Sequence, residues 1–144
     1  MSSHYLDTFS LIKTHIITKL QLELSPRLTY HSLGHTKDVL KQVQLIAARE
    51  GIENEEKIFL LKVAALYHDT GFLVTYSGHE EKGCELGKKE LPGFGLTSPQ
   101  IDKICSMIMS TKIPQSPKNN LEQIICDADL DYLGRDDFET ISNN

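Results

Sequence analysis

The sequence LYHDTG at residues 66–71 follows directly on the apolar run IFLLKVAAL, residues 58–66, and places a histidine beside an aspartate. The run is apolar nearly all round and is interrupted only by Lys62, which is typical of a helix in the middle of a bundle. Burying His68 and Asp69 at its end is costly unless a partner compensates them. A divalent metal ion is the simplest partner, and we then expect the rest of the chain to supply further ligands.

Length and composition narrow the class of protein. The chain has 144 residues, enough for one domain, and a net charge of -5 at pH 7, which argues against a nucleic-acid partner. Its 3 cysteines form no CxxC pair, so free thiols in a reducing cytoplasm are expected. No apolar run reaches the roughly 18 residues that a membrane span needs. We therefore expect a cytoplasmic protein that binds neither nucleic acid nor membranes.

Apolar residues recur at helical spacing along the whole chain, and no strand pattern or repeat is visible. We predict an all-α bundle of six or seven helices within a single domain, 1–144. The predicted helices cover about 3–24, 35–50, 55–70, 79–91, 99–110 and 121–133. A seventh helix begins near Asp136 and is unfinished at Asn144, which raises the expectation of a C-terminal extension.

Several helix ends carry local signals. Ser25-Pro26 is expected to stop the first helix, with a connector over 27–34, because proline disfavours α geometry in the residue before it. Asn54 is a suitable N-cap for the third helix. Ser98 as N-cap, followed by Pro99 at the first helical position, predicts another helix start. Residues 111–120, with two prolines and two asparagines, predict an exposed loop.

The side chains that can carry chemistry lie at predicted helix ends or on apolar faces. They are His31, His35, His68, Asp69, His79, Asp127 and Asp129. Asp129 has Ile125, Tyr132 and Leu133 as helical neighbours, so it shares the apolar face and requires a partner. Asp127 lies about 200° away around the same helix and is expected to face water. Asp129 is therefore the better ligand candidate.

Two imidazoles and two carboxylates from these candidate residues would give a metal ion a mixed set of nitrogen and oxygen donors. Such a set suits Mn²⁺, Fe²⁺, Co²⁺, Ni²⁺ or Zn²⁺ better than Ca²⁺ or Mg²⁺, although Mg²⁺ stays among the options. Four ligands leave coordination positions open for water and substrate. Open positions distinguish a catalytic metal site from a closed structural one.

Four segments together resemble the HD superfamily of metal-dependent phosphohydrolases. They are YHSLGHTKDV (30–39), AALYHDTG (64–71), HE (79–80) and DADLDYLG (127–134). The resemblance spans roughly residues 28 to 135 and implies that the predicted bundle is HD-domain-like. It implies that the metal ligands are His35, His68, Asp69 and Asp129.

The first segment is similar to the YHNxxHAxDV segment of cyclic-nucleotide phosphodiesterases. That similarity implies that His31 is a general acid toward the leaving group, and that Asp38 orients a ligand histidine. His79 is a second candidate for binding phosphate or protonating the leaving oxygen, since imidazole titrates near neutral pH.

These residues are compatible with two functions. The first is a metal-dependent phosphohydrolase that cleaves a phosphomonoester or phosphodiester, with a small phosphorylated substrate, preferably a nucleotide, as its partner. The alternative is a non-catalytic HD domain that acts as a regulatory or ligand-sensing module. The complete ligand set favours the enzyme.

Overall fold

The computed structural model describes residues 2–23, 26–68, 70, 78–112 and 115–129, with side chains except at residues 2–3 and 26–33. The elements are α1 (Ser2–Glu23), α2 (Pro26–Arg49), α3 (Glu55–Tyr67), α4 (His79–Glu90), the 3-10 helix η2 (Leu91–Phe94) and α5 (Ser98–Ser110). A further helical segment covers residues 120–129. No strand occurs within these ranges, so the predicted all-α fold is confirmed.

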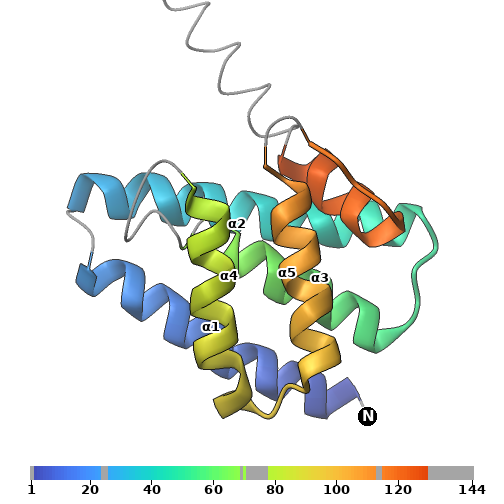
Figure 1. Cartoon of the computed structure of the whole chain (residues 1–144), viewed down its shortest axis with the longest axis horizontal. Coiled ribbons are helices and arrows are strands. Elements are labelled where there is room, and N and C mark those ends of the chain that lie inside the picture. The colour runs from blue at the N-terminus through green and yellow to red at the C-terminus, as the bar shows by residue number, and fades with distance from the viewer. Residues whose placement is uncertain (1, 24–25, 69, 71–77, 113–114, 130–144) are drawn as a thin grey trace, which may run out of the picture.

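The apolar helix α3 lies in the middle of the bundle, as predicted. It packs against α1, α2, α4 and α5, and every residue from Phe59 to Tyr67 except Lys62 is buried. Figure 1 shows α4 and α5 side by side in front of α3, with α1 and α2 along the other sides. Each fully buried Leu, Val or Phe contributes about 1.5–3 kcal/mol. The burial of α3 therefore fixes where its C-terminal end, with His68, must lie.

The helix α2 begins at Pro26, so the predicted connector over 27–34 is wrong. Proline is well suited to the first position of a helix, because its fixed φ is already helical and its missing N–H is not needed there. Pro26 therefore starts a helix as well as limiting the preceding one. As a result, His31 stands one helical turn before His35 on a continuous helix.

Two helix starts show how the local signals act. The side chain of Asn54 accepts a hydrogen bond from the Lys57 backbone N–H at 2.9 Å, which confirms the predicted cap of α3. In α5 the cap is Thr97 rather than the predicted Ser98. The Thr97 hydroxyl accepts from the Gln100 backbone N–H, and the Gln100 side chain accepts from the Thr97 backbone N–H. This capping box satisfies two backbone donors at the start of α5, whereas Ser98 has no polar side chain three residues further on to complete such a pair.

The three cysteines are buried and free, and two of them lie at the contact between α4 and α5. The thiol of Cys84 donates to the carbonyl of Cys105, and the thiol of Cys105 donates to the carbonyl of Cys84.

Among the described helices, none combines the length and the apolar character that crossing a membrane requires.

Candidate metal centre

His68 caps the C-terminal end of α3, where its backbone N–H still donates to the carbonyl of Ala64 at 2.9 Å. The residue is 1% exposed. The ring Nδ1 lies 2.7 Å from the carbonyl oxygen of Ala65, which can only accept, so Nδ1 carries the proton. In the neutral imidazole, Nε2 then keeps its lone pair. The end of α3 thus presents a ring nitrogen with a lone pair, which is the form of imidazole that can ligate a metal ion.

Asp129 lies at the end of the described helical segment 120–129 and is 7% exposed. Ile125 and Ala128 of the same segment are also buried. Asp127 is exposed instead, and its Oδ1 accepts a hydrogen bond from Gln123 at 2.8 Å. The predicted difference in environment between the two aspartates, derived from helical phase, is confirmed.

His35, His68 and Asp129 come together from three separate helical segments. Asp129 Oδ1 lies 3.2 Å from His35 Nε2 and 3.5 Å from His68 Nε2. The two imidazole rings meet edge to face, with centroids 5.2 Å apart. One donor atom from each of the three residues lies within 4.8 Å of the others. Three of the four predicted ligands therefore share one site.

The two distances from Asp129 Oδ1 to the imidazole nitrogens fit a first-row divalent ion. Ligand atoms at about 2.1 Å from one ion are roughly 3.0 Å apart at right angles and about 3.4 Å apart at the tetrahedral angle. The separations of 3.2 and 3.5 Å lie close to these values. Two imidazole nitrogens with one carboxylate oxygen form a donor set that Zn²⁺, Fe²⁺, Co²⁺, Ni²⁺ and Mn²⁺ accept.

Two predicted site residues are not placed by the structure. Asp69, the predicted fourth ligand, lies outside the described residues. The backbone of His31 belongs to α2, but its side chain lies outside the described part of the chain. Their assignments stay predictions.

His79 is the first residue of α4, directly after Gly78, whose φ of 74° is left-handed. Its Nε2 lies 3.2 Å from the Glu80 carboxylate, and the three-residue donor group does not include it. The next residue, Glu81, accepts a hydrogen bond from Lys112, which follows the end of α5. That bond lowers the pKa of the Glu81 carboxyl and raises the pKa of Lys112, so both stay charged at neutral pH. The start of α4 is thereby tied to the segment after α5.

The segment after α5 is predicted from its composition to be an exposed loop, but part of it is buried and part of it contacts Asp129. Thr111 is buried, and the side chain of Gln115 donates to Asp129 Oδ2 at 3.4 Å. Sequence patterns did not identify Gln115, because a polar residue between prolines carries no periodic signal. The contact depends on how α5 and the segment 120–129 pack together.

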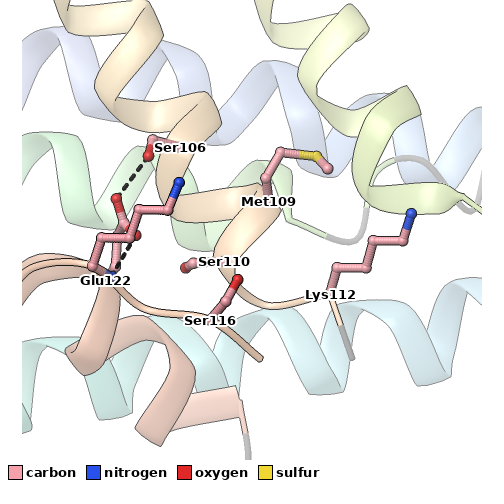
Figure 2. A pocket seen from close by; sticks show the side chains of 7 residues that line it. Ser106, Met109, Ser110, Lys112, Ser116 and Glu122 are labelled. Atoms are coloured by element: carbon pink, nitrogen blue, oxygen red, sulfur yellow. Dashed lines mark hydrogen bonds between the residues drawn. The ribbon is translucent and has the colours of Figure 1, made fainter. Parts of the chain in front are cut away.

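A pocket of about 350 Å³, lined mostly by polar and charged residues, lies beside this loop (Figure 2). Glu122 is one of the residues that line it and is 2% exposed. Its carboxylate accepts hydrogen bonds from the Ser106 hydroxyl at 2.7 Å and the Lys118 backbone N–H at 3.0 Å. Asn119 caps the helical segment by accepting from the Glu122 backbone N–H at 3.0 Å. These bonds fix the start of the segment that carries Asp129.

Comparison with known proteins gives one match. A family model described as HD domain matches residues 32–131. The matched range includes His35, His68 and Asp129, and it begins one residue after His31. No curated protein and no solved structure matches the chain.

Proposed function

Because the chain belongs to the HD-domain family, we propose that it is a metal-dependent phosphohydrolase that cleaves a phosphomonoester or phosphodiester, with a nucleotide as the favoured substrate. HD domains are typically metal-dependent phosphohydrolases, and they usually bind divalent ions. The observation that carries the proposal is the position of Asp129 Oδ1, which faces the Nε2 atoms of His35 and His68. A buried carboxylate between two imidazoles is a donor set for a cation.

In the proposed centre, His35, His68 and Asp129 hold the ion, and Asp69 is the proposed fourth ligand. When bound, such an ion polarises a phosphoryl oxygen and makes water a better nucleophile near neutral pH. The protein keeps the donors in place before binding. The carbonyl of Ala65 holds the His68 ring, and packing of α3 fixes the helix end from which that ring projects. Preformed donors reduce the reorganisation that catalysis requires.

The leaving oxygen needs a proton, and His31 and His79 are the proposed sources. His31 stands one helical turn before His35 on α2. His79 opens α4, where backbone N–H groups at the helix start favour a phosphate. The imidazole Nε2 of His79 lies 3.2 Å from the Glu80 carboxylate.

A substrate screen tests the proposal. Protein stripped with a chelator and reloaded with Mn²⁺, Co²⁺, Ni²⁺ or Mg²⁺ is offered nucleotides and generic phosphate esters, and the released phosphate, nucleoside or nucleoside monophosphate is measured. We expect turnover that requires the ion and disappears in the stripped protein. Metal uptake without turnover of any ester would favour the ligand-sensing module, and absence of metal uptake would overturn both readings of the centre.

A further inference from the structure

The two carboxylate oxygens of Asp129 face different partners. Oδ1 points to the imidazoles of His35 and His68, at 3.2 and 3.5 Å. Oδ2 lies 3.4 Å from the side-chain nitrogen of Gln115. An amide nitrogen can only donate, so this contact turns one oxygen of Asp129 away from the imidazole side.

The loop that carries Gln115 is held on both sides. Before it, the Thr111 hydroxyl donates to the carbonyl of Ile108 at 2.6 Å. After it, the backbone N–H of Ser116 donates to the carbonyl of Ser110 at 3.1 Å, and that of Lys118 donates to Glu122. Figure 2 shows Ser116 and Lys112 on this loop, next to the end of α5. The Gln115 amide therefore approaches Asp129 from a loop with fixed ends.

We propose that Gln115 is a positioning residue for the metal centre, an inference that rests on the proposed function. By holding Oδ2, its amide presents Asp129 to the ion through Oδ1 alone. A carboxylate that binds through both oxygens occupies two coordination positions and suits the larger shell of Ca²⁺. One-oxygen binding suits a smaller first-row ion and leaves a position for water or a phosphate oxygen. Gln115 thus sets both affinity and the preference for small ions.

The chain contains its own control for this contact. Gln123 donates to Asp127 Oδ1 at 2.8 Å on the exposed side of the segment 120–129. That bond joins the same two residue types, and Asp127 takes no part in the three-residue donor group. Gln115→Met and Gln123→Met therefore remove the same kind of hydrogen bond, near the centre in one case and away from it in the other.

The test is titration calorimetry of stripped wild type and both variants with Ni²⁺ and with Ca²⁺. Loss of a hydrogen bond to a metal ligand typically lowers affinity by about 10–100-fold. We expect that loss for Ni²⁺ in Gln115→Met, together with a smaller preference for Ni²⁺ over Ca²⁺, and wild-type values in Gln123→Met. The change in preference distinguishes positioning from a general loosening of the fold, which lowers affinity for both ions alike.

The remaining outcomes overturn either the positioning role alone or the proposed function with it. Wild-type affinity and preference in Gln115→Met, or equal losses in both variants, overturn the positioning role and leave the proposed function standing. Failure of the wild type to bind Ni²⁺ overturns both. If Gln115→Met does not fold, Gln115→Asn is the second variant, because it withdraws the donor by one carbon without adding apolar surface. It must show the same loss for the inference to stand.

Discussion

Tyr67, the residue before His68, donates a hydrogen bond from its buried hydroxyl to Glu90 Oε1 on α4 at 2.8 Å. The other oxygen of Glu90 lies 3.0 Å from His15 and 3.7 Å from Lys19, both on α1. Burial, and then the bond to Glu90, raise the pKa of Tyr67, so its hydroxyl stays protonated. The end of α3 is thereby joined to α4 and α1 by one carboxylate.

Tyr67→Phe is expected to lower the free energy of unfolding by about 0.5–1.5 kcal/mol, the net worth of one hydrogen bond. Glu90 keeps its α1 partners, so a larger loss is not expected. Urea unfolding measures the change. Tyr5→Phe is the control, because the Tyr5 hydroxyl makes no hydrogen bond to the described residues and its ring packs against Phe59. Equal losses in the two variants would contradict the role assigned to Glu90.

Asp129→Asn is expected to abolish metal binding, whereas Asp127→Asn is expected to be mild. The first change removes the negative charge that faces two imidazoles, and the second alters an exposed side chain. Exposed substitutions of this kind usually stay within about 0.5 kcal/mol in stability. Elemental analysis of protein purified without chelator reads the outcome. Loss of metal from Asp127→Asn alone would show that the helical phase does not select the ligand.

His31→Ala and His79→Ala are expected to lower turnover while metal content stays unchanged. Loss of a general acid typically costs about 10²–10⁴-fold in rate. Initial rates with the best substrate from the screen, together with elemental analysis, separate the two effects. Loss of metal in the His79 variant would indicate a further ligand or a second ion. Unchanged rates in both variants would favour the sensing module.

Lys62→Met is expected to stabilise the protein at pH 7. Lys62 is half-buried with its ammonium 4.2 Å from the centre of the Phe9 ring. Burial, and then the charge of Lys13, lower the pKa of Lys62 below 10.5. A lowered pKa means that the unfolded chain binds the proton more strongly, so the folded state is penalised at pH 7.

The sign of that penalty gives a pH test. The penalty is full below the folded pKa of Lys62 and fades as the pH rises through it toward 10.5. Thermal unfolding should therefore show Lys62→Met above the wild type at pH 7, with the gap narrowing toward pH 10.5. Lys57→Met, on the exposed side of the same helix, is the control and should show no such trend. A gap that is constant with pH would assign the gain to packing alone.

Sequence patterns predicted those features that depend on residues close together in the chain. The all-round apolar run identified α3, and helical phase distinguished Asp129 from Asp127. The start of α2 was missed because Pro26 carries two opposite signals: it limits the residue before it and favours the helix after it. Choosing between them requires knowing whether the residues from 27 onward pack as a helix.

Tertiary contacts explain what the patterns could not reach. The meeting of His35 with His68 and Asp129 was expected only through family resemblance, since spacing alone does not bring distant helices together. Gln115 could not be found at all, because its contact with Asp129 depends on how the loop is anchored at Ser110 and Glu122. Polar residues in loops have no periodicity to read.

The donors of the proposed centre are far apart in the chain, with His35 and Asp129 separated by 94 residues. An ion that joins them acts as a crosslink that closes a long loop. For a covalent crosslink, the chain-entropy model gives about 4.7 kcal/mol for a loop of 100 residues, and a reversible metal bond supplies part of that. Removing the ion should therefore lower the free energy of unfolding of the whole bundle, while the donors stay in place in the folded chain. Amide hydrogen exchange at the most protected buried residues would then report metal occupancy.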